Sequence, residues 1–375
     1  MPTPLGDLAI LDFSRVLAGP FATMVLADLG ADVVKIERPG TGDETRAWGP
    51  PYDSRGQATY FQAVNRNKRS VAIDLHSPAD VARLRELANE SDVVVENFRP
   101  GFLDGLGLGY EDLRCENPTI IYCSITGFGR GAGANLPGYD LLVQALGGLM
   151  SITGPADDEP QKVGVALVDV LAGLFATVGV LAALRHRDRT GQGQRVEIDL
   201  LSSLLAALVN QGSAYTIAGV VPTRMGNAHP SIAPYELFET ADGELVVAVG
   251  NDRQFQSLCK VLELSHLALD PRFQDNAARV RHRGELRAEL ERALSCRSAP
   301  AWAEELNAAR VPAGVVNDIA GAFALAESLG LDPVVELPPR EAGDPVRLTR
   351  NPIGLSATPP AYRAAPPSMP AYGGN

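Results

Sequence analysis

One carboxylate in the middle of the chain has no other charged residue near it in the sequence. Asp169 is the only charged residue between Lys162 and Arg185, in a stretch dominated by Val, Ala, Leu and Gly. A carboxylate that opens an apolar helix can act as an N-cap, which accepts hydrogen bonds from the free amides of the first turn. The same geometry makes a desolvated carboxylate a positioned nucleophile for acyl transfer. The neighbouring residues leave both interpretations open.

A glycine-rich segment, Gly127–Gly133, follows directly on a predicted strand. Glycines let the backbone approach a phosphate or a carbonyl closely, so the segment predicts either a binding loop or a surface turn. Its spacing is not that of a dinucleotide motif, and no Walker-type Lys-Ser or Lys-Thr is present. The five histidines are scattered, without a G-x-S-x-G or H-E-x-x-H motif. This pattern argues against a serine hydrolase and a zinc hydrolase.

Two loops carry further candidates for substrate contacts. Trp48, one of only two tryptophans, stands close to Arg46, and His229 lies in a segment rich in Gly and Pro. Loops hold binding residues more often than regular elements do. The alternatives are a tryptophan that only packs and a histidine that only faces solvent.

Basic residues fall between predicted elements in the N-terminal half: Arg38, Arg66, Lys68, Arg69 and Arg99. Arg38 and Arg99 follow strand ends, and in an open α/β sheet the carboxyl ends of the strands share the edge where ligands bind. We therefore expect these two arginines to meet there and to suit an anionic, phosphate-bearing ligand. A solvated charged surface is the alternative.

The elements that must position these residues alternate between strand and helix over the first 200 residues. Short apolar runs predict strands, and segments with helical spacing separate them, which indicates parallel βαβ units and an α/β fold. The predicted strands are 8–13, 32–37, 71–75, 92–96, 119–124 and 194–198, and the predicted helices are 21–29, 78–89, 139–149, 169–186 and 200–218.

The chain changes character after residue 233. Strands at 235–240 and 244–249 flank Ala241-Asp242-Gly243, which predicts a hairpin. Helices are expected next, then one more strand at 312–316, which together predict a smaller α+β domain. The expected helices are 252–262, 276–294, 299–308 and 319–329. The segment from Leu337 onward is rich in Pro and Gly and is expected to lie along a surface without regular structure.

Composition restricts the class of protein. The chain has 375 residues, 45% hydrophobic and 21% charged, with a net charge of −12. These values are typical of a globular enzyme of about two domains and exclude a disordered, coiled-coil or collagen-like protein. The negative charge argues against nucleic acid as a partner.

Targeting and cysteine patterns predict a cytoplasmic protein that binds no membrane. The N-terminus carries Asp7 and no cationic region, so it resembles neither a secretory signal nor a transit peptide. The longest apolar run, Val170–Leu184, is short for a membrane span. The four cysteines are far apart and form no C-x-x-C pair, which argues against disulfides and structural zinc.

Six blocks of residues, in this order along the chain, resemble the class III CoA-transferase family. The resemblance extends to about residue 330, and the segments 120–127 and 226–235 look most like the branch that moves CoA between dicarboxylates. The blocks are Val16–Ala22, Gly30–Gly40, Asn65–Ser70, Val95–Gly101, Gly138–Asp140 and Val163–Gly173.

The resemblance implies a fold and an assembly. The expected fold is α/β, with a large Rossmann-like CoA-binding domain (1–200), a linker helix region (201–225), a small α+β domain (226–325) and a C-terminal segment (326–375) that returns to the large domain. Two chains are expected to form a homodimer of interlocked rings. CoA is expected as a substrate, with no separate cofactor and no metal.

The resemblance also implies roles for particular residues. Asp169 is expected to attack the thioester of an acyl-CoA, with succinyl-CoA as the expected donor, and to carry first an acyl anhydride and then a CoA thioester. CoA itself is expected to contact Val16, Arg38, Ile73, Leu75, Asn97, Phe98, Arg99 and Tyr139. The far carboxylate of a dicarboxylic acceptor needs a cation, for which Arg46, Arg224 and His229 are candidates, with Trp48 as a further substrate contact.

The chain departs from the formyl-CoA transferases in three places. Leu17 stands where they carry Gln, Gly105 stands where they carry a basic residue, and Gly226–Pro230 replaces their glycine-rich loop. An acceptor other than formate or oxalate is therefore expected.

Two alternatives share the implied fold. An α-methylacyl-CoA racemase needs two acid/base groups on opposite faces of the α-carbon, and the racemases carry His where Tyr139 stands here. With a reference pKa near 10, Tyr is a poor base at neutral pH. The second alternative is a non-catalytic CoA-binding protein, against which the presence of Asp169 argues.

Overall fold

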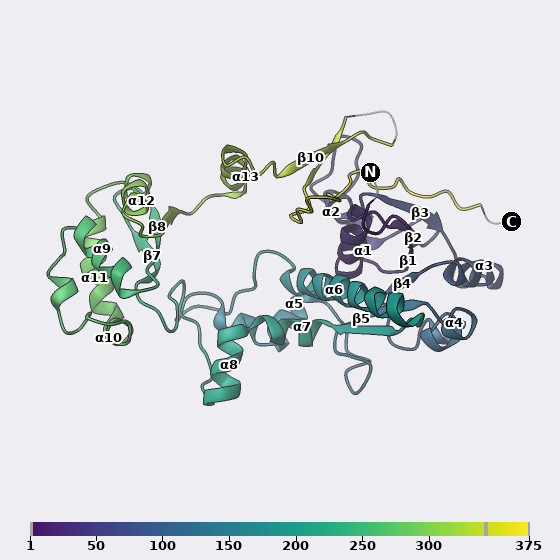
Figure 1. The fold of residues 1–375 in the computed structure, drawn as a ribbon, viewed down its shortest axis with the longest axis horizontal. Helices are drawn as coiled ribbons and strands as arrows, with labels where there is room; N and C mark the ends of the chain where they lie inside the picture. Colours follow the sequence, from purple (N-terminus) through teal and green to yellow (C-terminus); the bar gives the residue numbers. More distant parts are fainter. Residues whose placement is uncertain (1–2, 341–343, 374–375) are drawn as a thin grey trace. The chain divides into compact units, whose positions relative to one another are not determined.

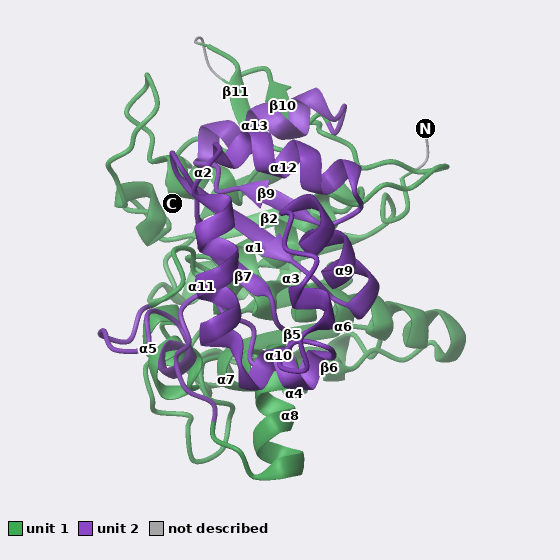
Figure 2. Ribbon diagram, turned by 90° about the vertical axis from the view of Figure 1, so that its left-hand side faces the viewer, with its two compact units in different colours: residues 1–149, 162–221, 332–375 green, residues 150–161, 222–331 purple. Residues whose placement is uncertain are grey.

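A computed structural model describes residues 3–340 and 344–373. The chain divides into two compact units, coloured green and purple in Figure 2. The first comprises residues 1–149, 162–221 and 332–375, and the second comprises 150–161 and 222–331. The expected domain limits at residues 1 and 375 lie outside the described residues.

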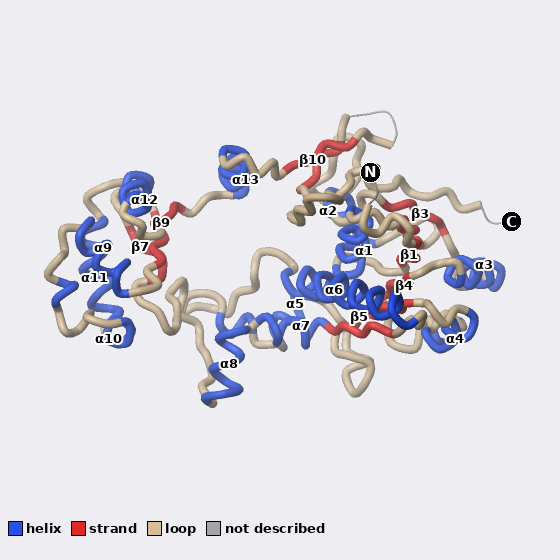
Figure 3. Tube along the Cα trace, in the orientation of Figure 1, coloured by secondary structure: helices blue, strands red, loops and turns tan. Residues whose placement is uncertain are grey.

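A six-stranded parallel sheet organises the first unit (Figures 1 and 3). Its strand order is β3-β2-β1-β4-β5-β6, which is the order of doubly wound dinucleotide-binding folds. The strands are β1 (Ala9–Asp12), β2 (Asp32–Glu37), β3 (Lys68–Ala72), β4 (Val93–Glu96), β5 (Ile121–Thr126) and β6 (Arg195–Asp199). The chain order reverses between β1 and β4, and ligands bind at the carboxyl ends of strands at such a point.

Side chains alternate between two cores on the two faces of this sheet. Ile10 and Val93 belong to one core, whereas Leu11 and Val94 belong to the other. This alternation follows from the two-residue repeat of a strand. The first core is covered by α1 (Ala18–Asp28), α6 (Leu167–Thr190) and α7 (Leu200–Ala207), and the second by α3 (Pro78–Asn89) and α4 (Tyr110–Glu116).

The long helix α6 is part of the core of the first unit. It is the one described helix that is long and apolar enough to span a bilayer, and it is longer than the apolar run 170–184 that the sequence shows. It packs against α1, α7, β5 and β6, and its residues Ala172, Ala176 and Val180 are buried. We interpret α6 as a core helix.

Local signals account for several element boundaries. The helix α3 begins at the residue expected, because the Ser77 hydroxyl accepts a hydrogen bond from the Asp80 amide and Pro78 occupies the first turn. The strand β2 also has the expected limits. Two shorter helices complete the site region, namely α2 (Thr59–Ala63) and α5 (Asp140–Leu146).

The second unit is a small α+β structure. The hairpin of β7 (Tyr235–Glu239) and β8 (Glu244–Ala248) is confirmed, and β9 (Ala313–Val315) pairs antiparallel with β8. The prediction of one helix over 276–294 is wrong, because the chain breaks at His282, which ends one helix and precedes the next. The helices are α9 (Asp252–Val261), α10 (Asn276–Arg281), α11 (Arg283–Leu294), α12 (Ala299–Ala308) and α13 (Ile319–Ser328).

The limits of the two units differ from the expected domain limits. The region 201–225 forms α7 and α8 (Val209–Ala218) and belongs to the first unit up to residue 221, because the apolar α7 packs on α6. Residues 150–161, expected in the large domain, belong to the second unit, as do residues 326–331.

The C-terminal segment is more regular than its composition suggests. Instead of lacking regular structure, it contains an antiparallel pair, β10 (Val334–Leu337) and β11 (Val346–Thr349). The chain beyond it is fastened to the first unit. The Arg363 guanidinium donates to the carbonyls of Ala27, Gly30 and Ala31 at the end of α1. Cations are favourable at a helix C-terminus because of the helix dipole.

Candidate active site

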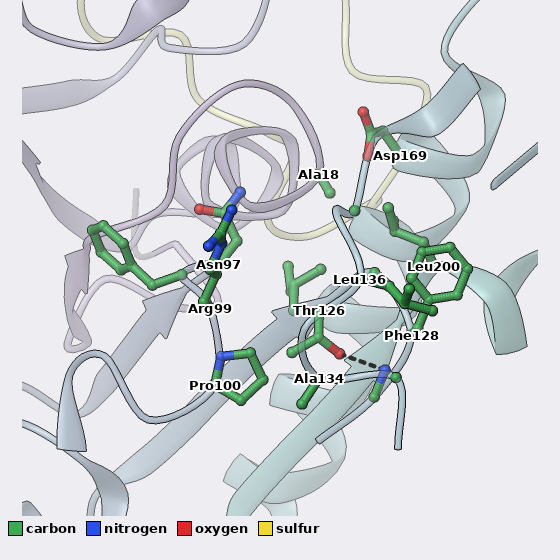
Figure 4. Close-up of a pocket in the computed structure, with 16 residues that line it drawn as sticks. Ala18, Asn97, Arg99, Pro100, Thr126, Phe128, Ala134, Leu136, Asp169 and Leu200 are labelled. Carbon is green, nitrogen blue, oxygen red and sulfur yellow. Dashed lines mark hydrogen bonds between the residues drawn. The ribbon is translucent and has the colours of Figure 1, made fainter. Parts of the chain in front are cut away.

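A pocket lies at the carboxyl ends of β4 and β5 (Figure 4). Its wall consists of Asn97–Pro100 after β4, the chain 125–129 at the end of β5, and part of the loop 133–138. Ala18 from α1, Asp169 from α6 and Leu200 from α7 complete it. The pocket therefore lies beside the point where the strand order reverses, and Asp169 faces it.

Asp169 lies in the first turn of α6 and is half-buried. Burial, together with the negative charge of Asp140, raises the pKa of Asp169 to about 7. Among the described residues, no donor lies within hydrogen-bond distance of its carboxylate. The group is thus a carboxylate with neither a cation nor an amide to stabilise its charge.

The N-cap interpretation of Asp169 is wrong, because another residue caps α6. The Asp140 carboxylate, at the start of α5, accepts hydrogen bonds from the amides of Val168 (2.8 Å) and Asp169 (3.3 Å). The N-cap residue of α6 is Ala166, whose side chain has no polar atom to serve this purpose. Sequence reasoning missed this role of Asp140, although the residue lies in the block Gly138–Asp140.

The glycine-rich segment is a pocket loop and not a simple surface turn. Gly127 and Gly138 touch where the loop begins and ends, and an added Cβ on Gly127 would lie 2.4 Å from the Gly138 Cα. Both positions therefore require glycine. Within the loop, the Gly129 amide donates to Thr126 Oγ1 at 3.1 Å (Figure 4).

A second pocket, of about 370 Å³, contains four of the predicted CoA contacts. Ile73 and Leu75 after β3, Arg38 after β2 and Phe98 after β4 all line it. Phe98 stacks on Phe102 and also lines the pocket of Asp169, so it lies between the two pockets.

Arg38 and Arg99 do not meet in one pocket as expected. Arg38 lines the second pocket and Arg99 lines the pocket of Asp169. The other three basic residues between the predicted elements of the N-terminal half have different surroundings. Arg66 and Lys68 are buried, and Arg69 forms an exposed ion pair with Asp32.

Asn97 lies in the loop after β4 and lines the pocket of Asp169, whereas Val16 lies in the loop after β1 and lines neither pocket. Asn97 accepts a hydrogen bond from the Arg15 amide (2.9 Å) and donates to the Arg15 carbonyl (2.7 Å). Val16 has a φ of +68°, which is strained for a β-branched residue. The Val16 amide donates a hydrogen bond to Asp43 Oδ2 at 3.3 Å, which stabilises this turn.

Buried charges lie beneath this turn. Lys35 Nζ is 2.9 Å from Asp43 Oδ2 and also donates to the Ser14 carbonyl. Lys68 Nζ is 3.1 Å from Asp12 Oδ2, and both side chains are fully buried. Because every charge has an opposite partner, the network fixes the loop after β1 at a tolerable desolvation cost.

The predicted substrate residues of the first unit lie in different surroundings. Both oxygens of buried Glu37 bind the Arg46 guanidinium, at 2.7 Å each, so Arg46 already has a carboxylate partner. Trp48 contacts Tyr60 edge to face at 5.4 Å. Tyr60 was not predicted; burial and the negative charge of Asp169 raise its pKa to about 12, which places it near Asp169. Tyr139, which is predicted to contact CoA, is 64% exposed, immediately precedes α5 and lines neither pocket.

Arg224 and His229 belong to the second unit. The Arg224 guanidinium donates to the carbonyls of Pro155 and Asp158. His229 Nδ1 accepts a hydrogen bond from the Ser231 amide, and its ring packs on Tyr235. Neither residue has a carboxylate partner in the described ranges.

The site contains groups that suit acyl transfer. Within residues 3–340 and 344–373, no three His, Cys, Asp or Glu side chains gather as metal ligands. A partly desolvated carboxylate, a glycine-lined backbone and a neighbouring pocket with apolar walls and arginines are features that suit acyl transfer from a thioester.

Comparison with known proteins agrees with this chemistry. The chain is 47% identical to a succinate–glutarate CoA-transferase of Agrobacterium fabrum, over 86% of this chain and 82% of that protein. It is 43% identical to the human succinyl-CoA:glutarate CoA-transferase, over 89% of this chain and 76% of that protein.

A solved structure and a family model give the same result. The crystal structure of a CaiB/BaiF family protein from Brucella suis matches with a TM-score of 0.87 and 42% identity, over 98% of this chain and 97% of that one. The model of CoA-transferase family III matches residues 5–372. The chain therefore belongs to CoA-transferase family III and is a CoA-transferase.

Proposed function

We propose that this CoA-transferase moves CoA from succinyl-CoA to a dicarboxylic acid through covalent intermediates on Asp169. The observation that carries the proposal is the Asp169 carboxylate, which faces a pocket without a hydrogen-bond donor of its own among the described residues. The substrate class rests on the succinate, glutarate and mesaconate named for similar CoA-transferases.

The first step is attack of an Asp169 oxygen on the thioester carbonyl. The new C–O bond forms an acyl anhydride, and the C–S bond breaks so that the CoA thiolate leaves with the electron pair. The thiolate then attacks the Asp169 carbonyl of the anhydride, which gives an aspartyl-CoA thioester and releases succinate. No proton is gained or lost in these two steps.

The second half of the cycle repeats this exchange in reverse. The acceptor carboxylate attacks the aspartyl thioester and forms a mixed anhydride, and the released thiolate then attacks the acceptor's carbonyl. The products are the new acyl-CoA and free Asp169. Each anhydride must be shielded from water, which the apolar neighbours Ala18, Leu136 and Leu200 favour.

The backbone of the pocket supplies the groups that stabilise an oxyanion. The glycine-containing segment 127–129 lines the pocket beside Asp169, and preorganised amides near a developing negative charge typically accelerate acyl transfer. The cycle uses CoA as a substrate and no other cofactor.

The second pocket fits the nucleotide part of CoA. Ile73, Leu75 and Phe98 offer apolar surface for a base, and Arg38 offers a cation for phosphates. Because Phe98 lines both pockets, the pantetheine arm is proposed to run past Phe98 and Asn97 toward Asp169.

The far carboxylate of a dicarboxylic acceptor needs a cation, and alanine substitution identifies which residue supplies it. Arg46 is a weak candidate because Glu37 already neutralises it. Arg224 and His229 remain candidates, and alanine at the residue responsible is expected to raise the KM of the acceptor more than that of succinyl-CoA.

We also propose that the chain forms the interlocked homodimer of its family. Two helices support this. Neither α8 nor α13 buries any of its residues within the chain, although α13 is largely apolar, and Ile217 of α8 is 85% exposed. Light scattering coupled to size exclusion is expected to give the mass of two chains. A cytoplasmic location stays a prediction.

Intact-protein mass spectrometry tests the covalent mechanism. Mixing the protein with succinyl-CoA is expected to give an adduct that hydroxylamine removes, and peptide mapping is expected to place it on Asp169. The Asp169→Asn variant is the control and is expected to show no adduct. Deuterium exchange at the α-carbon of an acyl-CoA, without any adduct, would instead support a racemase and overturn the proposal.

A further inference from the structure

We infer that Asp140 is a positioning residue for Asp169, because its carboxylate occupies the amides at the head of α6 and leaves the Asp169 carboxylate without partners in its own helix. The inference rests on the proposed function, in which that carboxylate attacks the thioester. Asp140 itself does not line the pocket.

The start of α6 explains why a second residue is needed. The first four amides of a helix have no partner within it, and the side chain of the N-cap residue normally accepts from the second or third of them. Asp169 stands in that turn, and Ala166 before it offers no acceptor. Oδ1 of Asp140 binds the amides of Val168 and Asp169 at 2.8 and 3.3 Å, so those donors are not available to Asp169.

Asp140 is itself held in place by Gln144, one turn further along α5. Gln144 Nε2 donates to Asp140 Oδ2 at 2.6 Å, so both oxygens of Asp140 are engaged. Gln144 Oε1 accepts a hydrogen bond from the Val163 amide at 2.9 Å, and Gln144 is buried. The two side chains together hold both ends of the segment 163–168 that leads into α6.

The surroundings of Asp169 make Asp140 the dominant charge. α1 and α7 present Ala18 and Leu200, which are apolar, and α2 presents Tyr60, whose hydroxyl is neutral at physiological pH. Arg99 is the cation on the pocket wall, but the pKa of Asp169 is raised, by burial and then by Asp140. As with thiolates, a group with a higher pKa is intrinsically the stronger nucleophile.

Two substitutions separate the charge of Asp140 from its hydrogen bonds. Asp140→Asn keeps the oxygen for the two amides but removes the charge and the acceptor for Gln144 Nε2, whereas Asp140→Ala removes the bonds to the two amides as well. Since Asn preserves the cap, it keeps the inference testable even if the Ala variant does not fold. Asp275→Ala is a matched control, because Asp275 caps α10 through a 2.7 Å hydrogen bond from the Ala278 amide, in the second unit.

The measurement is the rate of Asp169 acylation by succinyl-CoA from pH 5 to 9, followed by quenching and intact mass. For Asp140→Asn we expect the acid-side midpoint to fall by about one pH unit, with a slower plateau. For Asp140→Ala we expect a plateau about 100-fold slower, because the Asp169 carboxylate can then bind its own helix amides. The Asp275→Ala control is expected to keep the wild-type midpoint.

The outcomes distinguish a failure of the proposed function from a failure of the role of Asp140. A wild-type protein that forms no adduct overturns the proposed function itself. The role of Asp140 alone is overturned if the wild-type protein forms the adduct but the variants behave otherwise than expected. In that case Asp140→Asn keeps the wild-type midpoint, and the slower plateau of Asp140→Ala is fully explained by its smaller fraction of folded protein.

Discussion

Two groups of buried charge lie near the carboxyl end of the sheet, and they are built in opposite ways. Beneath the loop after β1, Asp12 and Asp43 face Lys68 and Lys35 at about ion-pair distance, 3.1 and 2.9 Å. At the head of α6, Asp169 has a like charge, Asp140, as its charged neighbour.

The pKa shifts of the two aspartates go in opposite directions for this reason. Burial by itself raises the pKa of Asp12, but Lys68 and Lys35 outweigh it, so the pKa of Asp12 is lowered. Burial also raises the pKa of Asp169, and Asp140 adds to the effect, which brings it to about 7. The paired charges around Asp12 thus make the loop after β1 rigid. The unpaired charge of Asp169 stays reactive, and this lowers the stability of the folded protein.

The largest expected effect is on catalysis at the unpaired carboxylate. Asp169→Asn is expected to lower kcat by at least about 1,000-fold, because the amide cannot form the anhydride. Steady-state assays with succinyl-CoA and glutarate test this. Activity within tenfold of wild type would contradict the role of Asp169.

The paired carboxylate is expected to show the reverse, a loss of stability. Asp12→Asn leaves Lys68 buried without its countercharge, which is expected to cost about 3–5 kcal/mol of unfolding free energy. Urea denaturation followed by circular dichroism measures this. A variant as stable as wild type would show that the network does not fix the loop after β1.

The same comparison predicts that Asp169→Asn is more stable than wild type at alkaline pH. Because the folded-state pKa of Asp169 is raised above 3.8, the native protein loses stability as the pH rises from about 4 through about 7. Removing the charge is expected to add on the order of 2 kcal/mol at pH 8 and nothing near pH 4. Thermal melts at both pH values test this sign, and equal melting temperatures at pH 8 would refute it.

The pH dependence of the reaction follows from the same shift. Ionised Asp169 is the attacking form, so kcat/KM is expected to rise about tenfold per pH unit below pH 7 and to level off above it. A pH–rate profile with succinyl-CoA checks this. An acid limb centred near pH 4 would indicate that the carboxylate is not desolvated during the reaction.

The smallest effect is expected at an exposed ion pair on the same sheet. Arg69 and Asp32 are 2.6 Å apart, but their side chains are 59% and 58% exposed. Arg69→Ala is expected to change the unfolding free energy by less than about 0.5 kcal/mol, since solvent screens such pairs. A loss of unfolding free energy as large as that of Asp12→Asn would show that burial does not explain the difference between the buried and the exposed ion pair.

Local signals made much of the fold predictable from the sequence. The strand β2 ends before Pro39, and α3 begins at Ser77-Pro78, so both limits depend on residues within one turn of the boundary. The break between α10 and α11 at His282 was missed, because both segments have helical spacing and no Gly or Pro separates them.

The roles of charged side chains were much harder to predict. Arg46 was expected to bind substrate, yet it is paired with Glu37. Lys68 is one of the basic residues that the sequence places between predicted elements, yet it is buried and paired with Asp12, 56 residues away in the chain. Burial and partner choice depend on which elements pack together, and periodicity contains no information on this.

The sequence by itself determined the alternation of strands and helices, the apolar setting of Asp169 and the family, because each of these is encoded in contiguous residues. Only the tertiary structure decided what Asp169 does at the head of α6. That depends on Asp140, 29 residues earlier, whose carboxylate reaches the helix amides only after α5 has packed against α6. Hydrogen bonds and charge interactions act over a few ångströms in space, and folding alone brings such distant residues within that range.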